Sequence, residues 1–210
     1  MKYKVMIVED QTMPRELFEL RVQASERFEL ALSIDNAALA DVYCLRFPVD
    51  LILMDVITRD GENGLDAAAR IKRAFPQIKI IIVTSMPECS YLKRAKEIGV
   101  ESFWYKEEQR ESLLDVMERT MNGESVYPGA SPELTLGMAS SYRFTERELD
   151  ILREITSGDT NQEIADRLNM SVATVKTHIL NMLEKTGFRN RTELAVRARE
   201  SGLVILNRRN

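Results

Sequence analysis

Short apolar runs alternate with helical patterns over the first 122 residues. The apolar runs read YKVMIV, FELALSI, VDLILM, IKIIIVT and ESFWY, and the helical patterns lie near residues 13–26, 36–46, 64–74, 89–98 and 108–121. Strands that alternate with helices need right-handed crossovers, which build a parallel sheet with helices on both faces. The central runs are apolar at consecutive positions, as strands buried on both faces should be. The pattern predicts a doubly wound α/β domain with a five-stranded parallel sheet over residues 1–122.

The pattern changes after this domain. Residues 123–142 contain three of the nine glycines and two of the six prolines, which predicts a linker, and we expect a short helical piece around Pro132–Met138. Beyond the linker the periodicity is wholly helical, with four segments that read TERELDILREITSG, NQEIADRLN, SVATVKTHILNMLEKTG and RNRTELAVRARESG. We therefore predict a four-helix, all-α domain over residues 143–210.

Local signals mark the ends of these last helices. Thr145 followed three residues later by Glu148 is a capping box, and Ser171 is suited to cap the third segment. Gly158 and Gly187 are typical helix stops.

Composition and charge narrow the possible functions. The chain has 210 residues, of which 44% are hydrophobic and 30% charged, and it contains no run of about 18 apolar residues and no signal peptide, so we expect a cytoplasmic protein without a membrane partner. A single histidine excludes a multi-histidine metal site. Residues 1–122 carry 17 basic and 21 acidic side chains, whereas residues 143–210 carry 12 and 10, which suggests two modules with different partners.

Polar side chains follow four of the predicted strands where each strand ends. Glu9 and Asp10 follow the first, Asp55 the third, Thr84 the fourth and Lys106 the fifth. Because a parallel sheet places the carboxyl ends of its strands along one edge, where ligands bind, we expect these groups to converge. Each acidic residue alone could instead be a helix cap or a turn residue.

The residue types in this group suit phosphoryl chemistry. Clustered carboxylates repel one another unless a cation lies among them, and a hard divalent ion, most simply Mg²⁺, is the natural occupant. Lys106 and Thr84 are suitable donors to a phosphoryl group, with Asp55 as the nucleophile that would carry it as an acyl phosphate. No Gly-rich phosphate loop follows the first strand, which argues against a nucleotide or flavin.

Residues 1–122 resemble the receiver domain of two-component response regulators. The similarity lies in the VED start, the aspartate after the third strand, the threonine after the fourth and the lysine after the fifth. The resemblance implies that Asp55 accepts phosphate from a histidine kinase and that Glu9, Asp10, Asp55 and the backbone carbonyl of Ile57 hold Mg²⁺. It also implies a flavodoxin-like fold, and that Thr84 and Phe103 form a switch pair.

The chain departs from the family pattern at two loops. The loop after Asp55 reads VITRDGENG, without the usual proline, and Glu107 stands where a proline usually follows the lysine, so a cis peptide is not expected there. In this family the positions of Ile57 and Met86 flank the path of the water that hydrolyses the acyl phosphate. Both side chains are apolar and cannot orient this water, so we expect slow self-dephosphorylation; alternatively, both simply pack on the loops.

Residues 161–180, NQEIADRLNMSVATVKTHIL, have the layout of a helix-turn-helix. Four positions of the second helix form one apolar stripe that should face the core: Val175, Ile179, Met182 and Thr186. The opposite side carries short polar groups, an amide and one cation, which can enter a major groove, although a generic amphipathic helix would show the same division.

The segment from FTERELD to NRTELA resembles the LuxR-type helix-turn-helix domain over its full length, with the elements TxRE, NxEIA, TVKxH and NRTEL in register. The resemblance implies that Lys176, Thr177 and Leu180 point toward bases. It implies that Asn161, Thr174 and Asn181 hold phosphates, and that the last helix, from Thr192, is a dimer surface.

Together the two resemblances indicate a response regulator of the NarL/FixJ class. It is expected to bind double-stranded DNA as a homodimer after phosphorylation, with RNA polymerase as a candidate further partner, and not to be an enzyme. Two alternatives stay open. One is an atypical receiver that dimerises and binds DNA without phosphate control, and the other is a phosphohydrolase with an aspartyl intermediate, although Ile57 replaces the second carboxylate that such an enzyme needs.

Overall fold

The computed structural model describes residues 2–59, 63–86, 89–106 and 111–204. The chain divides into two compact units, the first formed by Met1–Ser85 with Tyr91–Ala130 and the second by Met86–Ser90 with Ser131–Asn210. The expected linker is shared between them, because its residues up to Ala130 group with the first unit and those from Ser131 with the second. Within the described ranges, no helix is both long and apolar enough to cross a membrane.

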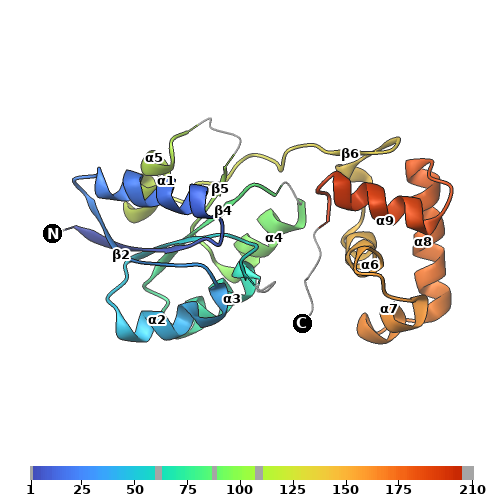
Figure 1. Ribbon diagram of the computed structural model, residues 1–210, viewed down its shortest axis with the longest axis horizontal. Helices are drawn as coiled ribbons and strands as arrows, with labels where there is room; N and C mark the ends of the chain where they lie inside the picture. Colours follow the sequence, from blue (N-terminus) through green and yellow to red (C-terminus); the bar gives the residue numbers. More distant parts are fainter. Residues whose placement is uncertain (1, 60–62, 87–88, 107–110, 205–210) are drawn as a thin grey trace. The chain divides into compact units, whose positions relative to one another are not determined.

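The first unit contains a parallel five-stranded sheet in the order β2-β1-β3-β4-β5. Its strands are β1 Tyr3–Val8, β2 Phe28–Ile34, β3 Leu51–Met54, β4 Lys79–Thr84 and β5 Ser102–Tyr105. Its helices are α1 Thr12–Gln23, α2 Ala40–Arg46, α3 Gly64–Ala74, α4 Cys89–Ile98 and α5 Leu113–Met121, with a short 3-10 helix η1 at Ala37–Leu39. Helices α1 and α5 cover one face of the sheet, and α2 and α3 cover the other (Figure 1). The predicted α/β fold class is confirmed.

Burial along the strands explains their consecutive apolar residues. All four residues of β3 and the last four of β1 are buried, since helices cover both faces of these strands. β2 is an edge strand, and most of its residues are half-buried. Its register with β1 shifts between Val5 and Met6, so β2 carries an extra residue there.

Helix α5 begins later than the sequence pattern suggested. The expected helix began at residue 108, whereas α5 starts at Leu113, because the Ser112 hydroxyl accepts a hydrogen bond from the Asp115 N–H and caps it. Residues 107–110, including Glu107, lie outside the described residues.

The second unit consists of α6 Glu146–Thr156, α7 Asn161–Arg167, α8 Val172–Thr186 and α9 Arg191–Glu200 (Figure 1). The short helical piece expected around Pro132–Met138 is wrong. That segment instead forms an antiparallel hairpin of β6 Thr135–Leu136 and β7 Ala139–Ser140, followed by the 3-10 helix η3 Ser141–Arg143. Leu136 and Ala139 are buried in the core of the helical unit, and this burial stabilises the hairpin.

The hairpin is attached to the end of α8. The Met138 N–H donates to the Thr186 carbonyl at 3.0 Å. Gly137 has φ +60°, and a Cβ there would lie 2.2 Å from the Thr186 oxygen, so a residue without a side chain is required. This contact fixes the hairpin to the last turn of α8.

The predicted helix ends are confirmed. Thr145 and Glu148 form the capping box of α6, the Ser171 hydroxyl accepts from the Thr174 N–H, and Gly187 ends α8 in the left-handed region at φ 75°. The Lys185 ammonium near the end of α8 also contacts both carboxylate oxygens of Glu148, at 2.7 and 2.6 Å, and ties α8 to the start of α6.

Candidate functional site

The groups expected at the carboxyl edge of the sheet do come together. Glu9 and Asp10 directly follow β1 and Asp55 directly follows β3, the neighbouring strand. One carboxylate oxygen of each lies within 4.8 Å of the others. Glu9 and Asp55 are buried and Asp10 is half-buried, so the cluster is a recessed set of hard oxygen ligands.

Lys106 connects two members of this cluster. Its Nζ donates to Glu9 Oε2 at 2.5 Å and to Asp55 Oδ2 at 2.7 Å, and its side chain is 10% exposed. The position of Lys106 follows from β5, because its N–H donates to the Thr84 carbonyl at 2.9 Å and continues the β4–β5 ladder beyond Tyr105. The cluster therefore sets one ammonium against three carboxylates.

Burial dominates the electrostatics of Asp55. Burial raises the pKa of this carboxyl to about 7, the Lys106 ammonium opposes the rise, and the Glu9 carboxylate adds to it. The pKa of Lys106 is raised, because the attraction of Asp55 and Glu9 outweighs the lowering that burial alone would cause. A further cation among these carboxylates would favour the charged form of Asp55.

The loop after Asp55 turns back on the strand end. The Ile57 N–H donates to Asp55 Oδ1 at 3.4 Å, and Ile57 forms an isolated antiparallel bridge with Asn63. The Gly64 N–H donates to the Val56 carbonyl at 2.8 Å. Residues 60–62 of this loop lie outside the described residues. The carbonyl of Ile57 as a metal ligand stays a prediction.

Gly64 is a residue of the site that the sequence pattern did not identify. A Cβ at this position would lie 1.9 Å from the Asp55 backbone oxygen, so α3 starts in direct contact with the strand end that carries Asp55. The signal available in the sequence was the pair Asn63-Gly64 at the expected start of a helix, where Asn63 indeed caps α3.

The two residues of the expected switch pair are both buried. Thr84 ends β4 and is fully buried, and Phe103 in β5 is 1% exposed, with its ring centroid 5.0 Å from that of Tyr105. Their arrangement on adjacent strands is compatible with a switch, and their role stays a prediction.

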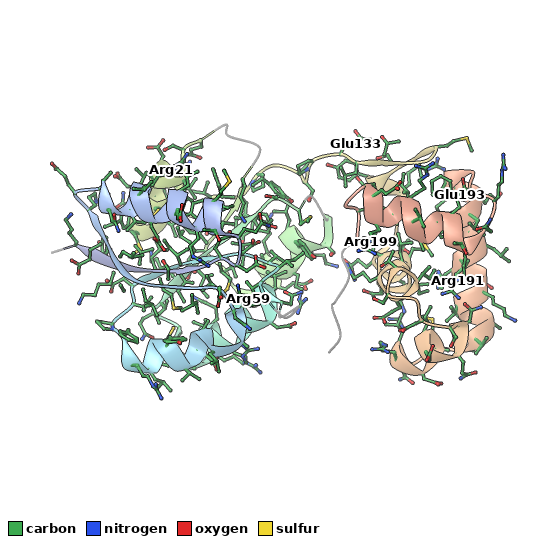
Figure 2. All side chains as sticks on the ribbon, in the orientation of Figure 1. Arg21, Arg59, Glu133, Arg191, Glu193 and Arg199 are labelled. Carbon is green, nitrogen blue, oxygen red and sulfur yellow. The ribbon has the colours of Figure 1, made fainter. Side chains whose placement is uncertain are left out.

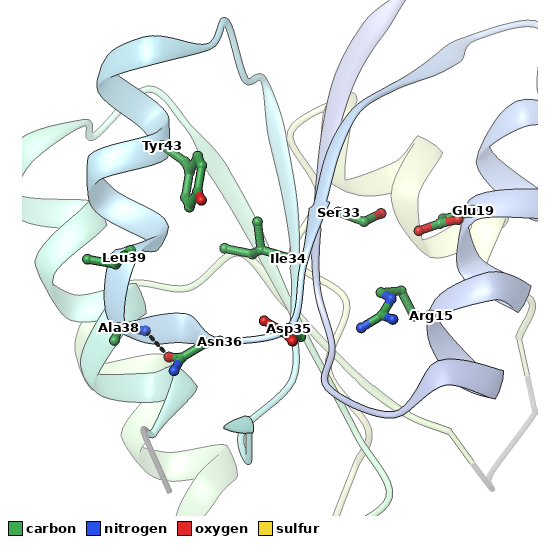
Figure 3. Close-up of a pocket in the computed structure, with 9 residues that line it drawn as sticks. All are labelled: Arg15, Glu19, Ser33, Ile34, Asp35, Asn36, Ala38, Leu39 and Tyr43. Atoms are coloured by element: carbon green, nitrogen blue, oxygen red, sulfur yellow. Dashed lines mark hydrogen bonds between the residues drawn. The ribbon is translucent and has the colours of Figure 1, made fainter. Parts of the chain in front are cut away.

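A hollow of about 550 Å³ lies over the end of β2, between α1 and η1–α2. Figure 3 shows Arg15 and Glu19 of α1 on one side of the strand and Leu39 and Tyr43 on the other. Arg15 also links this hollow to the acidic cluster, because its Nη1 donates to the Glu9 carbonyl at 3.0 Å. The sequence pattern gave no indication of this contact.

The second candidate site is α8. The predicted apolar stripe of Val175, Ile179, Met182 and Thr186 is buried, as expected. The residues expected to face DNA are exposed: Thr174, Lys176, Thr177, Leu180 and Asn181. Leu180 is 65% exposed.

Three of the expected DNA contacts have partners within the protein. The Thr174 hydroxyl is hydrogen-bonded to the Ser171 hydroxyl at 2.8 Å. The Thr177 hydroxyl donates to the Ala173 carbonyl at 3.0 Å, which leaves its oxygen lone pairs to accept from a ligand. Asn161 begins α7 and is half-buried, and its Oδ1 accepts from Arg191 at 3.0 Å.

Comparison with known families matches both units. Residues 5–118 match the family model described as response regulator receiver domain, and residues 143–198 match that of bacterial regulatory proteins of the luxR family. The response regulator protein VraR of Staphylococcus epidermidis is 32% identical over 212 residues, covering 97% of this chain and 100% of the relative, and VraR of Staphylococcus aureus gives the same values.

Solved structures share the fold at lower identity. RcsB from Salmonella enterica serovar Typhimurium, bound to promoter P1flhDC in the presence of phosphomimetic BeF3-, aligns with a TM-score of 0.60 and 20% identity, over 97% of this chain and 100% of that one. The response regulator ChrA of a heme-sensing two-component system aligns with a TM-score of 0.52 and 20% identity, over 97% and 99% of the chains.

Proposed function

The chain belongs to the family of two-component response regulators, as a phosphorylation-controlled DNA-binding transcription regulator, and we propose that Asp55 is the residue that accepts the phosphoryl group. One observation carries this proposal: Asp55 is buried at the end of β3, in contact with Lys106 and within a cluster of carboxylates. Lys106 donates to both Glu9 and Asp55, and Asp10 adds a third carboxylate, so the cluster carries more negative charge than this ammonium balances.

The carboxylate cluster fits a magnesium ion. Glu9, Asp10 and Asp55 together with the backbone carbonyl of Ile57 would hold it, because their hard oxygen atoms and excess negative charge suit this ion. When bound, Mg²⁺ supplies positive charge to the carboxylates and to the oxygens of the incoming phosphoryl group.

The donor in the cell would be a histidine kinase, the partner that a receiver domain implies. A carboxylate oxygen of Asp55 forms a bond to phosphorus as the bond between phosphorus and the kinase imidazole nitrogen breaks, and that nitrogen keeps the electron pair and is then protonated. The Lys106 ammonium and the Thr84 hydroxyl donate to the phosphoryl oxygens. Movement of Thr84 toward the new charge opens space for Phe103, and this pair transmits the change to the domain surface.

DNA binding would use the exposed side of α8. Lys176, Thr177 and Leu180 face the bases, with Leu180 suited to a thymine methyl group. Asn161, Thr174 and Asn181 contact phosphates. A homodimer formed through α9 would place two copies of α8 on a two-fold DNA site, and the paired half-sites would raise the affinity. RNA polymerase would be a further partner of the DNA-bound dimer.

The test measures the intact mass of the protein after incubation with Mg²⁺ and acetyl phosphate, with Asp55→Asn as the matched control. The proposal expects one phosphoryl adduct on the wild type and none on the variant. An adduct on both proteins would place the phosphoryl group elsewhere. The same samples, followed by size-exclusion chromatography and DNA binding, test whether the adduct promotes dimerisation.

The rival candidates predict different outcomes. An atypical receiver would dimerise and bind DNA equally well with and without the adduct. A phosphohydrolase would turn over a phosphoester continuously, which we do not expect, because Ile57 stands two residues after Asp55 where such an enzyme carries a second carboxylate.

A further inference from the structure

The motif Asn190-Arg191-Thr192-Glu193-Leu194 opens α9 (Figure 2 labels Arg191 and Glu193). Three of its residues have local roles. The Asn190 side chain caps the helix by accepting from the Glu193 N–H at 2.9 Å, Glu193 accepts from the Arg189 N–H at 2.9 Å, and Leu194 is buried in the core. None of these contacts explains Arg191.

Arg191 reaches across to the start of α7. Its Nη1 donates to Asn161 Oδ1 at 3.0 Å and its Nη2 donates to the Asp159 backbone carbonyl. The two acceptors flank Thr160, the N-cap of α7, so the planar guanidinium holds both sides of this cap. We refer to these two hydrogen bonds as the Arg191 clasp.

The clasp determines which way the Asn161 amide points. A guanidinium donates and never accepts, so the amide atom that faces Arg191 must be the oxygen. The amide nitrogen, which carries two donor hydrogens, is therefore directed away from Arg191. Rotation of the Asn161 amide group about its Cβ–Cγ bond has a low barrier. Removing Arg191 would therefore let the group present its oxygen outward, which a phosphate would repel.

We propose that Arg191 is a positioning residue for DNA binding: through the clasp it keeps the Asn161 amide nitrogen oriented to donate to a phosphate oxygen of the DNA backbone. This inference rests on the proposed role of Asn161 as a phosphate contact. Arg191 acts through Asn161, so the two residues should contribute as one unit and not independently.

A double-mutant cycle on the full-length chain tests this dependence. The proteins are the wild type, Asn161→Ala, Arg191→Lys and the double variant, and the probe is a random-sequence DNA duplex at low salt, because phosphate contacts do not depend on base sequence. Lysine keeps the positive charge of Arg191 but cannot form both bonds of the clasp. We expect each single variant to bind the duplex about threefold to tenfold more weakly than the wild type, which is the effect of one hydrogen bond. The double variant should bind no more weakly than Asn161→Ala.

Two controls address the substitution itself and the stability of the fold. Arg189→Lys makes the same substitution at an exposed arginine two residues earlier and should leave the affinity unchanged. Asn161→Asp keeps an acceptor for Arg191 but has no amide donor, so it should retain the unfolding midpoint of the wild type and still lose DNA affinity. The added negative charge alone weakens binding to phosphates, so this variant tests stability, and the double-mutant cycle tests orientation.

Each other outcome overturns a defined part of the reasoning. Wild-type affinity in Arg191→Lys, or a further loss in the double variant equal to that of Arg191→Lys alone, would refute positioning through Asn161. Wild-type affinity in Asn161→Ala would remove the phosphate contact, and the inference with it, while DNA binding itself stands. A wild-type chain that binds no duplex even after incubation with Mg²⁺ and acetyl phosphate would overturn the proposed function as well.

Discussion

Substituting Gly64 by alanine perturbs the phosphoacceptor site without changing any charged group. The added methyl carbon would lie 1.9 Å from the Asp55 backbone oxygen and 3.0 Å from Met54 Cγ, whereas real contacts of this kind essentially never fall below 3.0 Å. Either the start of α3 or the Asp55 carbonyl must therefore move by about 1 Å. Because the crowded oxygen belongs to Asp55, the shift bears directly on the phosphoacceptor residue.

The expected magnitudes follow from this displacement. At an unconstrained site, Gly→Ala stabilises a protein by about 0.4–1 kcal/mol, because the unfolded chain loses entropy. Here overpacking should reverse the sign and destabilise the receiver unit by about 1–3 kcal/mol. A misplacement of about 1 Å in a reacting group can slow its reaction about 100-fold, and we expect a loss of this order in phosphoryl transfer to Asp55.

Calorimetry measures the unfolding midpoint, and intact mass against time with Mg²⁺ and acetyl phosphate measures the rate of phosphorylation. Gly129→Ala is the matched control, because a Cβ added at Gly129 would have no atom within 4 Å and the same substitution should be neutral or slightly stabilising. If Gly64→Ala kept both the midpoint and the rate of the wild type, the close approach of α3 to Asp55 would not constrain the site.

Three further predictions concern other parts of the molecule. In Glu148→Gln the Lys185 ammonium loses its carboxylate partner, so we expect a loss of about 2 kcal/mol and a lower midpoint for the helical unit by calorimetry. Burial alone would raise the pKa of Glu148, but hydrogen bonds from Lys185 outweigh this effect and lower it. The contribution of Glu148 to the stability of the fold is therefore complete above the unfolded-state pKa of about 4.3, and it is lost as the pH falls through the lower folded-state pKa. The difference between wild type and variant should therefore shrink in acid, and a constant difference would contradict the assignment. Lys106→Met leaves two buried carboxylates without their ammonium and should cost about 3 kcal/mol of stability, a loss that added Mg²⁺ reduces. Thermal melts of wild type and variant with and without Mg²⁺ measure this loss. The same loss in both conditions would contradict the prediction. The combined variant Ile57→Asn, Met86→Glu should lose its acyl phosphate faster than the wild type when decay is followed by intact mass, because its polar side chains can orient the attacking water. A faster decay in the wild type would contradict the prediction that the apolar pair slows hydrolysis.

Strong local patterns in the sequence predicted much of the fold. Short apolar runs identified all five strands of the sheet, and the spacing of Val175, Ile179 and Met182 identified the buried side of α8. These predictions succeed because the signal of each element lies within the element itself.

Features that depend on distant residues were not predictable in this way. The β6–β7 hairpin has strands of two residues each, and its stability comes from the burial of Leu136 and Ala139 among helices that follow it in the chain. The contact of Gly64 with the Asp55 carbonyl and the bond from Arg15 to Glu9 likewise join separate elements. A pattern of residue types can place carboxylates on one sheet edge, but it cannot give the interatomic distances within the cluster.

The attachment of the hairpin to α8 also determines how the DNA-binding unit can be isolated as a fragment. A fragment that began at residue 143, where the family similarity starts, would lose two buried residues, Leu136 and Ala139, and the hydrogen bond that Met138 donates to Thr186. Its core would be open to water beside the last turn of α8, the helix that is proposed to read DNA. The folding unit therefore begins near Ser131, and the chain that arrives from the receiver is itself part of the DNA-binding domain.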